Sequence, residues 1–311
     1  STRPGAHAGP ASRCGAAPAG LDVQRRLGRG GEDEELVSAA LSPESVERQA
    51  VPSRRSFDAM GTEVELLVYG SAASALVALD EAEAEIRRLE DVFSRFRSDS
   101  ELSRLNAAGT ASVSDDLLDV VVYALDARLR TGGRFDPTVH DALVAAGYDR
   151  TLELVREGRP AAWPAAAPPC GGRVDVDVAA RTIRLAPCVH LDLGGIAKGY
   201  AAERACDALA VAGPCLADIG GDLAVRGCPP AGEWRVEVDT ADDTVTLAIP
   251  YGAFATSGRD RRLWAVEGGR RGHHLIDPCR GRPAESDLLR VTVAAGSARA
   301  AEVQAKALFL V

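Results

Sequence analysis

The sequence predicts an α+β fold, with helices flanking mixed or antiparallel sheets. Apolar residues recur at helical spacing in some segments and alternate with polar residues in others. The two kinds of segment do not follow the strict strand–helix–strand order that a parallel sheet requires. Hydrophobic residues make up 46% of the 311 residues, which is enough to fill one large domain or two lobes.

Charge, hydropathy and cysteine content indicate which partners and which cellular compartment to expect. The chain has 36 basic and 45 acidic residues, a net charge of −9 and no long basic block, so we expect no nucleic-acid partner. No apolar run approaches the roughly 20 residues of a membrane span, so none is expected. Seven scattered cysteines without a C-x-x-C pair indicate reduced thiols and a cytoplasmic protein. Because the chain does not begin with Met, export with removal of a signal stays open.

The chain divides into an arm and a folded domain. Residues 1–52 are rich in Ala, Gly, Pro, Arg and Glu and lack periodicity, which predicts a disordered or partner-binding arm. The folded domain is then expected over residues 53–311. Alternation of apolar residues over 64–68 predicts a strand, with residues 60–62 at its entry.

Helices are expected next along the chain. Apolar residues at helical spacing predict an amphipathic helix over residues 72–93. Residues 98–100 are of N-cap types and precede a short helix that carries Leu102 and Leu105. Ser114 caps a further helix, which a glycine pair at residues 132–133 ends.

Strand content rises in the second half of the chain. Residues 173–178 and 181–185 predict a hairpin, and residues 215–227 predict two strands around a second glycine pair. The closing segment, residues 297–311, predicts a helix. Further strands are expected in residues 234–240, 244–250, 251–257, 262–267 and 288–294.

A glycine-bearing turn is the most informative local pattern. A short apolar strand at residues 189–193 is expected to lead into Gly194 and Gly195, and a helix to begin near Ile196 with Lys198 in its first turn. Glycine lets backbone approach a ligand closely, and a helix N-terminus favours an anion. The pattern predicts a phosphate cradle, with a tight turn beside a solvated lysine as the alternative.

Two more glycine turns are expected after strands, at Gly220–Gly221 behind Asp218 and at Ser257–Gly258. Basic and acidic side chains follow them and suggest a site for a phosphorylated ligand, because guanidinium groups suit phosphate. The alternative for the arginines is a solvated hairpin tip. The alternative for the two histidines is that they lie on a strand, with one side chain facing outward and the other inward. These side chains are Arg259, Arg261, Arg262, His273, His274 and Asp277.

The chain resembles a known family, the ApbE-type flavin transferases, or FAD:protein FMN transferases, over residues 57–311. The matching stretches, in chain order, are MGTEVELLV, FSRFRSDSELSRLN, GRFDPTV, LDLGGIAKGYAAERA, ADIGGDLAVRG, ATSGRDRR, HHLIDP and AAEVQAKALFLV. The resemblance implies a two-lobed fold with the ligand cleft between the lobes.

The resemblance also implies an activity. Members bind FAD and move its FMN half to a Ser or Thr hydroxyl of an acceptor protein, with release of AMP and assistance from Mg²⁺; some members only hydrolyse FAD. FAD and an acceptor protein are therefore the expected partners, and a homo-oligomer stays open. In-line phosphoryl transfer requires alignment, charge neutralisation and a base for the incoming hydroxyl.

Site residues follow from the resemblance, position by position. His274 and Asp277 would stand beside the reacting phosphorus, as candidates for the general base. The other implied positions are Met60 and Phe96 against the isoalloxazine, Gly194, Gly195 and Lys198 near the phosphates, Asp218, Gly220, Gly221 and Asp222 on the adenosine side, and Ser257, Gly258, Arg262 and Ile276 along the cleft.

The sequence departs from the family at the metal site. The resemblance implies an Asp-x-x-x-Thr pair on the closing helix and a backbone carbonyl near Ala197 as Mg²⁺ ligands, but Glu302 and Lys306 stand at the paired positions. Charged lysine has no lone pair to offer a metal. Lys306 is therefore a catalytic candidate that would neutralise the diphosphate in place of the ion, or else it pairs with Glu302 one turn earlier.

Two further departures concern the end of the domain. Cys279 and Arg280 follow the Asp-Pro turn where the family has Thr, and the chain ends at Val311, before strands that the resemblance implies. These departures leave an alternative function open: a repurposed ApbE-like protein that binds FAD without transfer, or that catalyses different chemistry in the same cleft. A non-catalytic partner that assembles with another chain is the third hypothesis.

Overall fold

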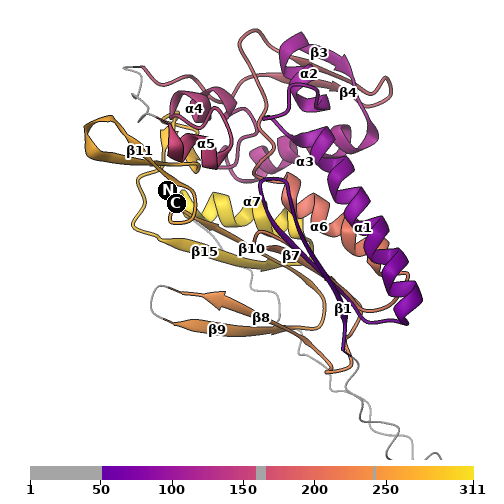
Figure 1. The fold of residues 1–311 in the computed structure, drawn as a ribbon. Coiled ribbons are helices and arrows are strands. Elements are labelled where there is room, and N and C mark those ends of the chain that lie inside the picture. The colour runs from indigo at the N-terminus through magenta and orange to yellow at the C-terminus, as the bar shows by residue number, and fades with distance from the viewer. Residues whose placement is uncertain (1–50, 159–165, 241–242) are drawn as a thin grey trace, which may run out of the picture. The chain divides into compact units, whose positions relative to one another are not determined.

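A six-stranded sheet is the central layer of the domain (Figure 1). The computed structural model describes residues 51–158, 166–240 and 243–311, so the predicted arm lies outside it except for residues 51–52. Every neighbouring pair in the order β1-β2-β6-β7-β10-β15 is antiparallel. The strands are β1 (Ser53–Ala59), β2 (Thr62–Val68), β6 (Cys215–Ile219), β7 (Asp222–Arg226), β10 (Gly252–Gly258) and β15 (Arg290–Ala295).

Three helices cover one face of this sheet, and a hairpin covers the other. The helices pack against one another and against the sheet through alanines and large aliphatic residues. On the opposite face, Trp234 and Leu247 of the hairpin pack on Leu216, Leu223 and Phe254 of the sheet. These elements are α1 (Ala72–Phe93), α6 (Ala197–Leu209) and α7 (Ala298–Phe309), and the hairpin strands β8 (Trp234–Asp239) and β9 (Thr244–Ile249).

The remaining elements complete the domain. Leu143 and Tyr148 pack on Trp264 and Ile276 in a small separate core, whereas the buried residues of α2, α3 and β5 belong to the main core. The elements are α2 (Glu101–Ala108), α3 (Asp115–Arg130), α4 (His140–Ala145), α5 (Leu152–Glu157), β3 (Thr110–Ser112), β4 (Val174–Asp177), β5 (Thr182–Leu185), β11 (Leu263–Val266), β12 (Arg270–His273), β13 (Ile276–Asp277) and β14 (Arg282–Pro283).

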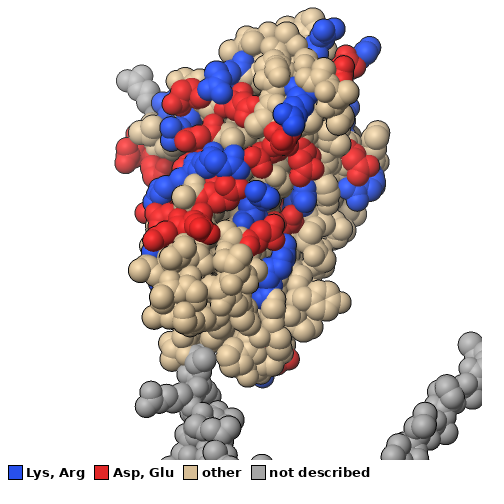
Figure 2. Space-filling view, turned by 90° about the vertical axis from the view of Figure 1, so that its right-hand side faces the viewer, with Lys and Arg blue, Asp and Glu red and all other residues tan. Residues whose placement is uncertain are grey.

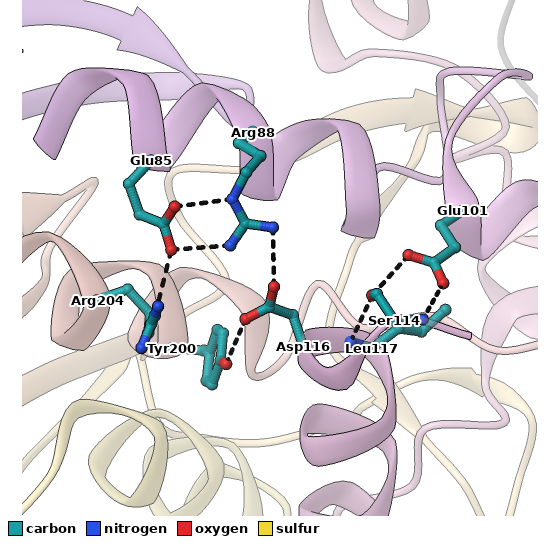
Figure 3. A network of polar contacts seen from close by, with 8 residues as sticks. All are labelled: Glu85, Arg88, Glu101, Ser114, Asp116, Leu117, Tyr200 and Arg204. Carbon is teal, nitrogen blue, oxygen red and sulfur yellow. Dashed lines mark hydrogen bonds and ion pairs between the residues drawn. The ribbon is translucent and has the colours of Figure 1, made fainter. Parts of the chain in front are cut away.

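Polar contacts tie α1, α3 and α6 together (Figure 3). Arg88 on α1 pairs with Glu85 on the same helix and with Asp116 at the start of α3, both at 2.8 Å. Tyr200 on α6 donates its hydroxyl to Asp116 at 2.7 Å, and Arg204 reaches Glu85 at 3.2 Å. The network holds α6, which carries Lys198, against the two neighbouring helices.

Charges of both signs intermix on the side of the molecule that carries α1 (Figure 2). The α1 pairs Arg87–Glu83 and Arg88–Glu85 contribute to this pattern. Within the described part of the chain, no helix is both long and apolar enough to cross a bilayer.

The α+β prediction and most elements are confirmed. The helix over residues 72–93 has the predicted ends, and Ser100 and Ser114 accept the N-cap hydrogen bonds of α2 and α3. The hairpin of β4 and β5, the strands β6 to β11 and β15, and the closing helix α7 also form where expected.

Two expectations about local structure are wrong. Residues 189–193 form no strand, because the N–H and C=O of Leu191 bond the Asn106 side chain and not a neighbouring strand. Residues 257–258 do not form a turn, because they close β10 and pair with β15. The predicted strand entry at residues 60–62 is confirmed, because Thr62 begins β2 directly after the turn that joins it to β1.

Candidate active site

Two cavities meet in the domain. The first, called the apolar cavity, has a volume of about 380 Å³. It lies between the helix-covered sheet and the small core around α4. Its lining includes Phe93 and Phe96 from the end of α1, Leu143 from α4, and Leu275 and Ile276 from the segment between β12 and β14. Aromatic and aliphatic walls of this kind suit a flat heteroaromatic ring.

The second, called the polar cavity, has a volume of about 500 Å³ and lies at the end of the main sheet. The β6–β7 turn contributes Asp218, Gly220 and Gly221, and the end of β10 contributes Ser257 and Gly258. Burial raises the pKa of Asp218, an effect that the Gly221 N–H offsets in part by donating to Oδ1 at 2.6 Å. Carboxylates, hydroxyls and backbone groups here suit a polar nucleoside.

Five residues line both cavities and form what we call the junction: Gly194, Lys198, Arg262, His274 and Lys306. Three of them are basic, and His274 is an imidazole. An elongated ligand with rings at both ends would therefore present its middle to a cluster of cations.

The buried carboxylate of Glu302 holds Lys198 and Lys306 in place. Its side chain is only 1% exposed, and it accepts hydrogen bonds from Gly199 N at 2.9 Å, Lys198 Nζ at 3.0 Å and Lys306 Nζ at 3.2 Å. Burial by itself would raise the pKa of Glu302, but Lys198 and Lys306 outweigh it and hold that pKa below its ordinary value. The Gly199 N–H, in the first turn of α6, therefore donates its hydrogen bond to this carboxylate and is not free to bind an external anion.

Lys198 bridges two buried carboxylates. Its ammonium pairs with Glu302 and with Asp222, whose side chain is 2% exposed. Desolvation lowers the pKa of Lys198 to about 8, although the charge of Glu302 opposes this shift. The lysine is therefore close to losing its charge in the mildly alkaline range.

His274 has a ring nitrogen with no partner. Its Nδ1 is buried and makes no hydrogen bond to any described residue. Desolvation, followed by the charges of Arg262 and Lys306, lowers the pKa of His274 well below its ordinary value. The imidazole is therefore neutral near pH 7 and can accept a proton from a ligand placed in the junction.

The Gly194–Gly195 turn permits this crowding. A Cβ on Gly195 would lie 2.9 Å from the Phe135 ring and 3.1 Å from the Lys306 stem, which is closer than side chains tolerate. Lys306 therefore lies over this turn because residue 195 lacks a side chain.

The hairpin turn beside the apolar cavity is strained. Met60 has φ of +54°, which is uncommon for a residue with a side chain. Glu90 on α1 holds the turn by accepting a hydrogen bond from Met60 N at 2.7 Å. This hydrogen bond holds the backbone of Met60, a residue that lines the apolar cavity, in its uncommon conformation.

Arg95 is a site residue that the sequence reasoning missed. Its guanidinium lies 4.2 Å from the Phe96 ring centre and 4.6 Å from that of Tyr148, and its Nε pairs with Asp192 at 2.8 Å. Its Nη2 is buried without a hydrogen-bond partner among the described residues. The sequence does place Arg95 next to Phe96, which could have indicated a role at the site. The second ring that Arg95 contacts belongs to Tyr148, 53 residues away, and only the fold brings the two together.

Most of the predicted site residues, Arg261 among them, are brought together around the two cavities, and five are not. Arg259 and His273 line neither cavity, and Nε2 of His273 lies 2.9 Å from the Ala284 carbonyl oxygen. Asp222 and Glu302 line neither cavity and act beneath the junction through the lysines. Asp277 also lines neither: it accepts from Cys279 N at 2.9 Å and pairs with Arg280 at 3.5 Å, within its own turn. The geometry therefore favours His274 over Asp277 as the general base. The remaining positions line at least one cavity: Met60, Phe96, Gly194, Gly195, Ala197, Lys198, Asp218, Gly220, Gly221, Ser257, Gly258, Arg262, His274, Ile276 and Lys306.

Comparisons with known proteins show which family the chain belongs to. A model of the ApbE family matches residues 60–311. A curated relative from Salmonella typhimurium, named FAD:protein FMN transferase, is 27% identical over 86% of this chain and 81% of its own length. A relative of the same name from Treponema pallidum is 31% identical, over 81% of this chain and 76% of its own length.

Solved structures match as well. The ApbE protein of Thermotoga maritima superposes with a TM-score of 0.72 at 26% identity, covering 83% of this chain and 86% of that one. The apo form of the flavinyl transferase ApbE from Pseudomonas stutzeri matches with a TM-score of 0.67 at 25% identity, covering 83% and 85%.

Proposed function

The chain belongs to the ApbE family, and from this premise we propose that it transfers the FMN part of FAD to a Ser or Thr hydroxyl of an acceptor protein and releases AMP. The observation that carries the proposal is the junction, where two cavities of different character share one imidazole and three basic side chains. FAD has the same order of parts: an apolar ring system, a diphosphate and a polar nucleoside.

The isoalloxazine is placed in the apolar cavity, against Met60 and Phe96. The Arg95 guanidinium contacts the Phe96 ring and helps to orient it. The adenosine is placed in the polar cavity beside Asp218, Gly220 and Ser257. In this arrangement the diphosphate lies across the junction, within reach of Lys198, Arg262 and Lys306.

His274 is the proposed general base. The acceptor hydroxyl oxygen attacks the phosphorus on the FMN side, its proton passes to the imidazole, and the bond from that phosphorus to the bridging oxygen breaks. The bridging oxygen and its electron pair leave with AMP. A neutral imidazole with a buried, unpartnered nitrogen suits this role, and basic side chains stabilise the charge that spreads over the phosphoryl oxygens.

The residues at the junction do not fit the Mg²⁺ that the family resemblance implies. Mg²⁺ requires about six oxygen ligands in near-octahedral geometry, and none of the five junction residues carries a carboxylate. Glu302 lies just beneath, but its oxygens already accept three N–H donors, two of them from lysines. We propose that Lys306 and Lys198 neutralise the diphosphate directly, so that transfer needs no divalent ion.

A cytoplasmic location forms part of the proposal. The six cysteines of the described residues are all free, which supports a reducing compartment. Cell fractionation tests this: the protein should appear with cytosolic markers, and recovery with exported proteins would favour the exported alternative.

Incubation with FAD and an acceptor protein that carries a target Thr tests the activity. Covalently bound flavin and AMP should appear in equal amounts, and the acceptor with Thr changed to Val should yield neither. Bound FAD without AMP release would contradict transfer and favour a carrier. AMP and free FMN without labelled acceptor would instead identify a hydrolase.

A further inference from the structure

Away from the two cavities, two imidazoles and a carboxylate converge on one point. His140 and Asp141 begin α4, and His190 lies in the loop that leads to the glycine turn. Oδ1 of Asp141 lies 2.8 Å from Nδ1 of His140 and 2.8 Å from Nδ1 of His190. We infer that these three side chains form a binding site for a divalent transition-metal ion of the zinc class.

The spacing suits a metal ion. Each residue offers one ligand atom, and the three atoms lie within 4.8 Å of one another. Bonds of about 2.0–2.2 Å in tetrahedral geometry place ligand atoms roughly 3.4 Å apart. On zinc entry the two hydrogen-bonded pairs at 2.8 Å would open, and the three atoms, which lie within 4.8 Å of one another, would take up about this spacing. A neutral imidazole that donates from Nδ1 frees that nitrogen when its proton moves to Nε2, so no ring has to change charge.

The chemistry of the ligands selects the class of ion. Imidazole nitrogen suits zinc, copper and nickel, whereas magnesium and calcium prefer an all-oxygen shell. The side chains of His140, Asp141 and His190 are 21%, 34% and 38% exposed, so an ion has a path from solvent and a position left for water. In the described ranges no other group of three or more His, Cys, Asp or Glu meets the same spacing.

The place of the cluster gives the ion a structural consequence. His190 is followed directly by residues 191–195, of which residues 192–195 line the apolar cavity. Leu143 on α4 lines the same cavity from the opposite segment. A bound ion would join these two walls, independently of whether the chain transfers flavin.

Calorimetric titration of the full chain with Zn²⁺ tests the inference. Wild type should bind one zinc per chain at this site, and excess Mg²⁺ should not compete. His140→Gln, His190→Gln and Asp141→Asn should each weaken binding by more than about 100-fold, beyond the 10–100-fold that outer-shell partners cost. Asp126→Asn, an exposed carboxylate paired with Arg130 on α3, is the matched control and should bind as wild type does.

Two further readouts separate this site from cysteine ligation. Co²⁺ should give the visible bands of a nitrogen–oxygen tetrahedral site without a thiolate charge-transfer band, and Zn²⁺ should raise Tm in wild type and control only. Far-UV circular dichroism verifies that each variant is folded. Zinc binding that persists unchanged in the three variants, a thiolate band, or no binding by wild type would each overturn the inference.

Discussion

At the residue scale, the surroundings of His274 determine how it titrates. Desolvation and the charges of Arg262 and Lys306 lower its pKa, so the imidazole stays neutral below the ordinary histidine pKa of about 6.5. We expect kcat to stay constant as pH falls through this value and to decline only at lower pH.

Replacement of the imidazole tests the same role. His274→Asn should lower kcat by about 10²–10⁴-fold, the usual contribution of a general base, and should leave the FAD Kd within a few-fold of wild type. Single-turnover transfer rates and equilibrium FAD titrations measure the two quantities. A wild-type kcat that falls with a midpoint at or above 6.5, or an unchanged kcat in the variant, would remove His274 from this role.

Lys198 predicts a pH dependence with two opposite signs. Its pKa of about 8 means that the folded protein loses this cation as pH rises through 8, so FAD should bind more weakly above that pH. Over the window from about 8 to about 10.4, the unfolded chain keeps the proton that the folded chain has lost. The free energy of unfolding should therefore rise with pH through this group.

Comparison with Lys198→Met isolates these effects. The variant should bind FAD weakly at every pH and should lack the rise in unfolding free energy between pH 8 and 10. Fluorescence titration of FAD and urea unfolding at a series of pH values provide the measurements. Equal pH profiles for wild type and variant would show that Lys198 is not the titrating group.

At the element scale, one side chain replaces a strand partner. Asn106 on α2 accepts from Leu191 N at 2.8 Å and donates to Leu191 O at 2.9 Å, which holds the loop that leads to the glycine turn. Asn106→Ala leaves both backbone groups without a partner and should cost about 2–4 kcal/mol of unfolding free energy. Ala107→Ser, at an exposed position on the same helix, should change it by less than about 0.5 kcal/mol. Urea unfolding of both variants decides: similar losses would contradict this role of Asn106.

The pair on α7 predicts that metal dependence can be created. Glu302 and Lys306 are one helical turn apart, and their ion pair stands where the family resemblance implies Asp and Thr. The double change Glu302→Asp with Lys306→Thr removes the ammonium and supplies two oxygens. Its transfer rate should become dependent on added Mg²⁺, and a rate with the same response to Mg²⁺ as wild type would reject displacement of the ion by Lys306.

The sequence predicted long elements better than the segments that carry the site. The helix at residues 72–93 repeats its apolar pattern over six turns, so its ends were predictable. The helices α4 and α5 are six residues each, shorter than the window in which periodicity is visible. Residues 189–193 resemble a strand in pattern, but the backbone of Leu191 bonds a side chain 85 residues away, and the Asp192 N–H donates to the Pro137 carbonyl.

Cavity-lining positions were predictable where residue identity alone suggests the chemistry. The glycines of the three predicted turns, with Lys198, Arg262, His274 and Lys306, were named from the sequence, and all of them line the cavities. The roles of Asp277 and Arg95 depend on neighbours that only the fold supplies. Asp277 is engaged by its own turn, and Arg95 lies between two rings from separate segments.

At the scale of the whole molecule, different parts of the fold form the two cavities and the junction. The main sheet and its end form the polar cavity, α4 and the end of α1 form much of the apolar cavity, and α6 and α7 bring their lysines to the line where the two meet. Buried Glu302 and Asp222 hold these lysines before any ligand arrives. Catalysis through fixed charges of this kind requires little rearrangement during the reaction.

The most direct test of this account is flavin transfer to a Thr-bearing acceptor protein in the presence of excess EDTA. Covalent acceptor flavin and released AMP are measured over the same time course with and without added Mg²⁺. The account predicts equal amounts of the two products and the same rate in both conditions. Transfer that stops in EDTA and returns with Mg²⁺ would contradict it.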